Sequence, residues 1–373
     1  MATYRVQIVG DRYSWAIQRA GLSVDDYINR HPKTTVSKWI SGEKQPTIKQ
    51  LEDFAKSVNV PFGFLFVPTV PKEEIPFPLF RGNARIDSFN LNVYDTVVKV
   101  VQRQEWLEDY LKENDIETCP FVATMSIKNS VQEVVVALRK ILNLNDTWAF
   151  GLSTSNEAVN ELSNRIEDVG IFLTYNGVVG NNGRRPISVQ DCRGFALVNK
   201  EAPYIFINNS DSKSAQLFTL IHELAHILVG VSAGYAGDAG YEHDYTEKFC
   251  DQVAAEFLVP SNLLTTVWNN DGIPSAAKKF KVSELVIARR ARDIGLIDSE
   301  QYRMFYLQYM QRMPANKKTS GGDYYRTSVK RVGRSFAIHV RNAVNSRQLS
   351  YTEAYRLTGL YGQTYDQFMK KYI

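Results

Sequence analysis

Apolar residues recur at helical spacing along most of the chain, in segments separated by turns that contain glycine, proline or serine. Between residues 13 and 66 these segments are short. Ser23 is placed to cap one helix, and Thr47 precedes an amphipathic run that contains Leu51 and Phe54. This pattern predicts a small helical domain at residues 1–68.

Longer helical patterns cover residues 93–111, 131–144 and 155–168. We expect all three to be scaffold, because apolar stripes of this kind are usually core. Residues 67–80 are rich in proline, which disfavours helix and predicts an extended linker or strap.

Three short runs rich in Ile, Phe, Val and Tyr follow, at residues 170–175, 193–198 and 203–208. They predict a small sheet ahead of a helix capped by Ser210, Asp211 or Ser212 and stopped by Gly230. Pro203 favours an edge position for the third strand, which could then hold an extended peptide by backbone pairing. The alternative is a purely structural strand.

The predicted fold class is therefore α+β and mainly helical. We expect a helical domain at residues 1–68, a proline-rich linker at 69–90, a domain with a helical lead-in and a small sheet at 91–272, and a helical region at 273–373.

Charge is unevenly distributed along the chain. The net charge is +3 for residues 1–68, −11 for residues 69–277 and +12 for residues 278–373. A basic segment of this kind suits nucleic acid, an acidic partner protein or the acidic middle of the same chain, and charge alone leaves these alternatives open.

The spacing of the cysteines and the hydropathy of the chain argue against a disulfide-rich, membrane-spanning or secreted protein. The three cysteines are widely spaced and include no C-x-x-C pair, so we predict neither a disulfide framework nor a cysteine zinc site. No apolar run reaches the roughly 18 residues that a membrane span needs, and the first residues lack the apolar core of a signal peptide. We expect a cytoplasmic protein.

The strongest chemical signal is H-E-x-x-H at residues 222–226. On a helix, His222 and His226 project from one face within reach of a single metal ion, with Glu223 between them. Glu247 follows twenty-one positions after His226, and Asp251 lies four residues further on the same helical face. This second stretch separates the motif from a chance match, which roughly one unrelated chain of this size in a hundred would contain.

These residues predict a hydrolytic zinc site. Zinc prefers four ligands arranged as a tetrahedron, and hydrolytic sites leave one position for water. We predict His222, His226 and Glu247 as ligands of Zn²⁺ and Glu223 as the general base, with Asp251 orienting a histidine ring. For the oxyanion of the transition state His243 is the candidate, with Tyr235, Tyr241 and Tyr245 as alternatives in the same loop.

Several stretches resemble the ImmA/IrrE family of metallopeptidases. The residues that carry the resemblance are R-G-F-A-L at 193–197, F-I-N-N-S-D-S at 206–212, F-T-L-I-H-E-L-A-H at 218–226 and E-K-F-C-D-Q-V-A-A-E-F-L-V-P at 247–260. E-E-I-P-F-P-L-F-R at 73–81, S-G-G-D-Y-Y-R-T at 320–327 and E-A-Y-R-L-T-G-L at 353–360 also look like members with an N-terminal helix-turn-helix domain. Asp251 stands where many members have Asn.

The resemblance implies a zincin-like domain in which His222, His226 and Glu247 bind zinc and Glu223 is the base. It further implies cleavage of a repressor or antitoxin protein, which relieves transcriptional repression under stress. The alternative is a DNA-binding regulator or antitoxin with a structural or vestigial metal site.

Two regions suggest contact with nucleic acid. Residues 39–66 resemble the latter half of an XRE-like helix-turn-helix domain, which would put Thr35, Ser37 and Lys38 in a major groove. Residues 274–295 form a second helix-turn-helix pattern, with Arg289 and Arg290 on or near its exposed side. Packing or protein contact is the alternative for both.

Two further expectations concern residues near these motifs. The aromatic residues Tyr302, Phe305, Tyr306 and Tyr309 have the spacing of a helix core. Cys192 and Cys250 are expected to be buried and unreactive, the alternative being thiols that regulate the zinc.

Overall fold

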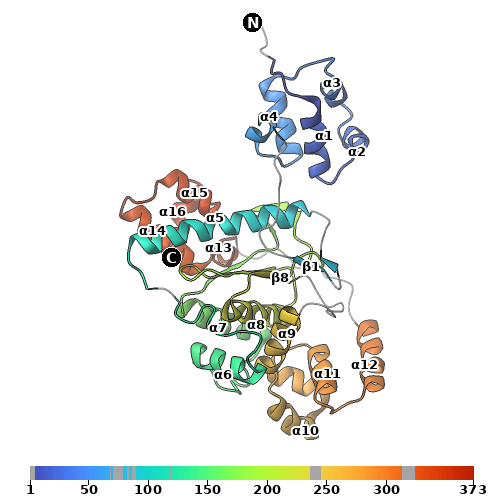
Figure 1. Cartoon of the computed structure of the whole chain (residues 1–373), viewed down its shortest axis with the longest axis vertical. Helices are drawn as coiled ribbons and strands as arrows, with labels where there is room; N and C mark the ends of the chain where they lie inside the picture. Colours follow the sequence, from blue (N-terminus) through green and yellow to red (C-terminus); the bar gives the residue numbers. More distant parts are fainter. Residues whose placement is uncertain are drawn as a thin grey trace. The chain divides into compact units, whose positions relative to one another are not determined.

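The computed structural model (Figure 1) describes residues 5–67, 69, 79–81, 84–85, 90–117, 119–235, 245–312 and 324–373. Of these, residues 79–81, 84–85, 233–235, 269–271 and 324–326 are described by their backbone alone. The chain forms two compact units, one of Met1–Pro76 with Ser88–Tyr94 and one of Phe77–Asp87 with Asp95–Ile373. Residues 273–373 lie in the second unit together with the sheet, and the division at residue 272 stays a prediction.

The N-terminal unit is helical, as its pattern predicted. Its elements are α1 (Gly10–Arg19), α2 (Val24–Arg30), α3 (Val36–Ile40), α4 (Ile48–Ser57) and the 3₁₀ helix Phe62–Leu65. Ser23 and Thr47 both form capping boxes. Tyr13, Trp39 and Phe54 meet in the core, with ring centroids 5.6–6.0 Å apart.

The second unit is mainly helical with a small sheet, which confirms the coarse fold class. Its first helices are α5 (Leu91–Glu113), α6 (Val131–Leu142) and α7 (Ser155–Asp168), close to the predicted ranges. A two-stranded hairpin joins β4 (Val178–Val179) to β5 (Asn182–Pro186). None of the described helices has both the length and the apolar character needed to cross a membrane.

The main sheet has the strand order β2-β1-β8-β6-β7-β3. Its strands are β1 (Leu79–Arg81), β2 (Ala84–Arg85), β3 (Phe172–Tyr175), β6 (Gly194–Leu197), β7 (Tyr204–Ile207) and β8 (Ala233–Tyr235). The expected edge position of β7 is wrong, because β7 pairs with β3 on one side and with β6 on the other. Its backbone groups are used within the sheet, so β7 is a structural strand.

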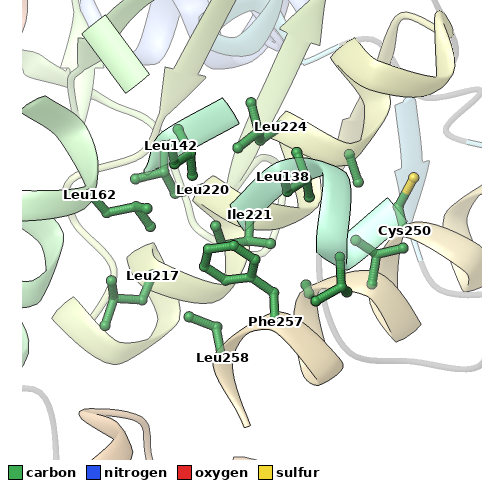
Figure 2. Close-up of a cluster of buried hydrophobic side chains, with 14 of the residues drawn as sticks. Leu138, Leu142, Leu162, Leu217, Leu220, Ile221, Leu224, Cys250, Phe257 and Leu258 are labelled. Atoms are coloured by element: carbon green, nitrogen blue, oxygen red, sulfur yellow. The ribbon is translucent and has the colours of Figure 1, made fainter. Parts of the chain in front are cut away.

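The helix that carries H-E-x-x-H, α8 (Lys213–Val229), packs on β6 and β7. Ser212 caps its start and Gly230 ends it in the left-handed conformation, as predicted. Figure 2 shows Leu217, Leu220, Ile221 and Leu224 of α8 among apolar side chains of α6, α7 and α9 (Tyr245–Leu258). One face of α8 is thus fixed by the core, which leaves the histidine positions on the side toward α9.

The remaining helices are α10 (Ser261–Phe280), α11 (Glu284–Asp293), α12 (Ser299–Arg312), α13 (Tyr324–Val332), α14 (Arg334–Asn345), α15 (Tyr351–Thr358) and α16 (Gln363–Tyr372). Within the second unit, Figure 1 shows α5 and α13–α16 on one face of the sheet and α6–α9 on the other. Arg103 of α5 contacts two of these C-terminal helices. Its guanidinium donates to the Leu357 carbonyl of α15 at 2.9 Å and lies over the Phe336 ring of α14.

The expectation that the aromatic face of α12 is core is wrong. None of its described side chains is buried: Tyr306 is 39% exposed, and Tyr302, Phe305 and Tyr309 are half-buried. Its main neighbour is α11, where the Arg292 guanidinium lies 4.7 Å from the Tyr302 ring centroid. Helical spacing identifies an apolar face but does not show that another element covers it.

Candidate metal centre

His222 and His226 lie one turn apart on α8 and are fully buried, with exposed fractions of 0% and 1%. Helical periodicity alone accounts for their shared face, because side chains four residues apart stack along a helix. Their Nε2 atoms are 3.2 Å apart. The local structure therefore brings two imidazoles together before any other element contributes.

The third side chain comes from α9, which packs across α8. The two Glu247 carboxylate oxygens lie 3.1 Å from His222 Nε2 and 3.1 Å from His226 Nε2. Zinc-to-ligand bonds of about 2.0–2.1 Å in a tetrahedron place neighbouring donor atoms roughly 3.3 Å apart. The spacing of these three donors thus fits a zinc ion, and the three residues form a buried group that could hold a metal.

The outer ring nitrogens of both histidines have acceptors. His222 Nδ1 lies 2.9 Å from Asp251 Oδ1, and His226 Nδ1 lies 3.1 Å from the Val231 carbonyl oxygen. If each Nδ1–H donates to its acceptor, both Nε2 lone pairs point toward Glu247, which is the arrangement that a metal requires. Asp251 was expected from the sequence. Val231 was not, because a backbone carbonyl has no sequence signature.

Glu223 is fully buried, and its carboxyl lies close enough to His222, His226 and Glu247 for their charges to affect its pKa. Neither carboxylate oxygen has a hydrogen-bond partner of ordinary geometry among the described residues, although the Ala196 N–H is near enough to lower the Glu223 pKa. Burial raises the pKa of Glu223 to about 8, against the lowering effect of His222 and His226. An unpaired buried carboxyl is costly, so a polar group bound in this space would stabilise it.

The metal-free site holds protons. Burial lowers the pKa of His226, but the Glu247 carboxylate beside its ring outweighs that effect and raises the pKa above its ordinary value. Burial raises the pKa of Glu247, and the two histidines outweigh that effect and lower it to about 2. Positive imidazoles around a carboxylate are therefore the metal-free form, and a divalent cation would replace the protons.

All three cysteines are buried free thiols. Burial is the largest effect on Cys192 and Cys250, and it raises the pKa of both thiols. A raised pKa keeps a thiol protonated and slow to react, so the expectation of unreactive side chains agrees with their surroundings.

The structure does not place any of the four residues predicted to stabilise the oxyanion beside the candidate metal centre. His243 and Tyr241 lie outside the described residues, and Tyr235 is described by its backbone alone. Tyr245, at the start of α9, is 81% exposed. Their proposed role stays a prediction.

The residues of the first helix-turn-helix segment that were predicted to read DNA lie on the N-terminal unit. Thr35 precedes α3, and Ser37 and Lys38 are exposed on that helix. Lys38 forms an ion pair with Glu43 at 2.7 Å. Exposure is compatible with groove contact, and the readout of DNA stays a prediction.

Arg290 does not lie on the exposed side of α11 as expected. Its guanidinium forms an ion pair with Glu256 and donates from Nε to the Val259 carbonyl at 3.1 Å. Glu256 lies in the last turn of α9 and Val259 directly follows that helix, so Arg290 ties α11 to the helix that carries Glu247. Arg289 is exposed, and the Ser283 hydroxyl caps the start of α11.

Two parts of the chain match known domain families. Residues 167–292 match Peptidase_M78, the IrrE N-terminal-like domain, and residues 332–371 match a domain of unknown function, DUF8813. No curated protein and no solved structure matches the chain. The first match covers β3, α8 and α9 and thus all the side chains of the candidate metal centre. The segment that carries His222, His226 and Glu247 is therefore similar to metallopeptidases of the IrrE/ImmA type.

Proposed function

We propose that this chain is a zinc-dependent endopeptidase that cleaves a repressor or antitoxin-type DNA-binding protein and thereby relieves transcriptional repression. The observation that carries the proposal is the buried cluster of His222, His226 and Glu247 with the unpaired carboxyl of Glu223 beside it. A purely structural metal site would have no use for this carboxyl, because a buried polar group without a partner lowers stability.

His222, His226 and Glu247 would hold the zinc. When bound there, the ion polarises a water molecule and the carbonyl of the scissile peptide bond. Glu223 accepts a proton from the attacking water and later donates it to the leaving amine nitrogen. Asp251 and the Val231 carbonyl fix the two imidazole rings while the proton moves.

A protein substrate is favoured by the similarity of residues 167–292 to IrrE-type peptidases. A DNA-binding substrate rests on the resemblance of the flanking segments to members with a helix-turn-helix domain. An N-terminal helical unit could bring the enzyme to the DNA that its substrate occupies, which would raise the local substrate concentration.

The test is the Glu223→Gln variant, which keeps the shape of the side chain and removes its ability to take a proton. Wild-type and variant chains are each co-expressed with the DNA-binding regulators encoded beside them, tagged at both ends. We expect a clipped fragment with the wild type and at least about 100-fold less with Glu223→Gln. Zinc content, measured by mass spectrometry, should stay at one ion per chain in both.

Two results would count against the proposal. Equal cleavage by both proteins would remove Glu223 from the reaction. A wild-type protein purified without zinc and unable to bind it would contradict the metal site itself.

A further inference from the structure

A second surface of interest lies on the C-terminal helices, within the segment that matches the domain of unknown function. Four tyrosines gather there, from α15, the following turn and α16. They are Tyr351, Tyr355, Tyr361 and Tyr365, and together with Arg341 of α14 and Lys370 of α16 we name them the tyrosine surface.

The four rings form a connected group. Tyr355 lies 6.1 Å from Tyr351, 5.9 Å from Tyr361 and 5.2 Å from Tyr365, measured between ring centroids. Tyr365 is buried and anchors the group. In contrast, Tyr351 is 57% exposed and Tyr361 is 66% exposed, so two aromatic rings are presented to solvent.

Exposure to this extent needs a reason. A helical core covers its aromatic residues, and large apolar side chains that remain outside in a group often mark a contact site. The neighbouring core residues Phe336 and Phe368 are fully buried, so this part of the chain does have a core that the exposed tyrosines do not join.

Positive charge adjoins the rings. Arg341 and Lys370 line an open hollow of about 220 Å³ together with Tyr351 and Tyr365. Neither cation forms an ion pair within the described part of the chain. Asp366 is also in the hollow, which leaves an excess of cations. Residues 332–371 as a whole carry six Lys and Arg against two Asp and Glu.

We propose that the tyrosine surface binds single-stranded nucleic acid, with bases stacked on Tyr351 and Tyr361 and phosphates contacted by Arg341 and Lys370. Exposed aromatic rings beside unpaired cations are the combination that single-strand binders use. A duplex keeps its bases stacked on one another and offers no free base face. An acidic protein would satisfy the cations but would leave the ring faces without a role.

This inference does not depend on the proposed peptidase activity, because none of its residues belongs to the metal centre. The two proposals can therefore fail separately. If both hold, the chain contacts nucleic acid at a place distinct from its predicted helix-turn-helix segments.

The experiment measures fluorescence anisotropy of the full chain with a labelled oligothymidylate of about 20 nucleotides, at low salt. We expect the double variant Tyr351→Ala/Tyr361→Ala to weaken binding at least about tenfold. The matched variant Tyr351→Phe/Tyr361→Phe keeps both ring faces and should bind like the wild type. Circular dichroism and cleavage of the regulator should be unchanged in both variants.

A second pair of variants tests the cations. Arg341→Glu with Lys370→Glu should weaken binding and reduce the dependence of affinity on salt by a slope of about 0.7 for each phosphate that the variant no longer binds. Lys128→Glu with Lys140→Glu, at two exposed positions elsewhere, makes an equal change of charge and should alter neither quantity. A duplex of the same length, titrated in parallel, reports binding by the N-terminal unit.

The proposal is overturned if the oligothymidylate does not bind, or if the alanine pair binds it like the wild type. Equal weakening by the alanine and phenylalanine pairs would also overturn it, because hydroxyl groups rather than stacking would then matter. Binding of polyglutamate without binding of the oligonucleotide would assign the surface to an acidic protein instead.

Discussion

The two histidines of the metal centre are oriented by acceptors of different kinds. His222 has a carboxylate, Asp251, and His226 has the backbone carbonyl of Val231. A carboxylate attracts the proton on Nδ1 more strongly than a neutral carbonyl does, and this makes the opposite ring nitrogen, Nε2, a better ligand. Only the Asp251 contact can be removed by substitution of a side chain, so it provides the direct test of ring orientation.

We predict that Asp251→Ala weakens zinc binding by about 10–100-fold. The His222 ring would lose the acceptor that fixes its tautomer, whereas the three ligands remain. Competition with a chromogenic chelator measures the affinity. Asp251→Asn keeps an oxygen that can accept from His222 Nδ1, and its affinity should fall between those of the wild type and the alanine variant. Unchanged affinity in Asp251→Ala would contradict the assigned contact.

Zinc binding should release protons and strengthen with pH. In the metal-free protein the Glu247 carboxylate raises the pKa of His226 above its ordinary value, so near pH 7 its ring is protonated and competes with the metal. As pH rises toward that pKa, fewer protons must be displaced, and the apparent affinity increases. Titration calorimetry in buffers of different ionisation enthalpy counts the released protons. A count of zero at pH 7, or an affinity that falls as pH rises, would contradict this reasoning.

At the scale of elements, the site depends on the close approach of α8 to β6. A Cβ placed on Gly194 of β6 would lie 2.6 Å from Thr219 Cγ2, 2.9 Å from the Phe206 carbonyl oxygen and 3.3 Å from Glu223 Oε1. Glycine at this position therefore lets α8 settle against the sheet with Glu223 beside the strand. The R-G-F-A-L stretch at residues 193–197, which carries part of the family resemblance, therefore also allows α8 to pack closely on β6.

We predict that Gly194→Ala destabilises the protein by about 1–3 kcal/mol and lowers cleavage, because the added methyl group forces α8 away from β6. Urea denaturation and the co-expression assay measure the two effects. Adding Thr219→Ser removes the nearest contacting atom and should recover part of the stability. Gly183→Ala on β5 is the control, since nothing lies within 4 Å of a Cβ there. Equal stability of Gly194→Ala and wild type would refute the packing argument.

Packing between helices also explains why the Arg290 side chain points inward. Its spacing from Arg289 and Arg292 indicated a basic helical face, yet Glu256 and the Val259 carbonyl draw its guanidinium inward. A buried ion pair is sensitive to the loss of either partner, so Arg290 contributes to the packing of α11 on α9. Reversing its charge is thus a poor test of DNA binding, because loss of binding could follow from loss of structure.

At the scale of the whole molecule, the chain holds separate hydrophobic cores. The core of the N-terminal unit, with Tyr13, Trp39 and Phe54, shares no residue with the core around α8. The metal centre lies within the second unit and links α8 to α9. A ligand stabilises only the cooperative unit whose folded form binds it.

We therefore predict two transitions in differential scanning calorimetry, of which zinc shifts only one. Zinc at about 1,000 times its dissociation constant adds about 4 kcal/mol, which raises the transition of the larger unit by roughly 5–10 °C. A chelator should reverse the shift, and the His222→Ala variant should show none. A single transition, or an equal shift of both, would show that the units unfold together.

Much of the local structure was predictable. Ser23 caps α2 where the sequence placed it, and Ser212 is one of the three caps that the sequence offered for α8, because a capping side chain bonds to backbone within three residues. The helix spacing of His222 and His226 likewise determines that they share a face. Such features depend on neighbours along the chain and need no knowledge of the rest of the fold.

What the sequence by itself determined is thus the mainly helical fold class, the helices on either side of the small sheet's strands, and the shared helix face of His222 and His226. The tertiary structure decided the rest: the inner position of β7, the inward turn of Arg290, the exposure of α12, and the Val231 carbonyl behind His226. Strand order and coverage of a helix face arise from contacts between segments far apart in the chain. Periodicity records which residues share a face, but only packing decides what that face meets.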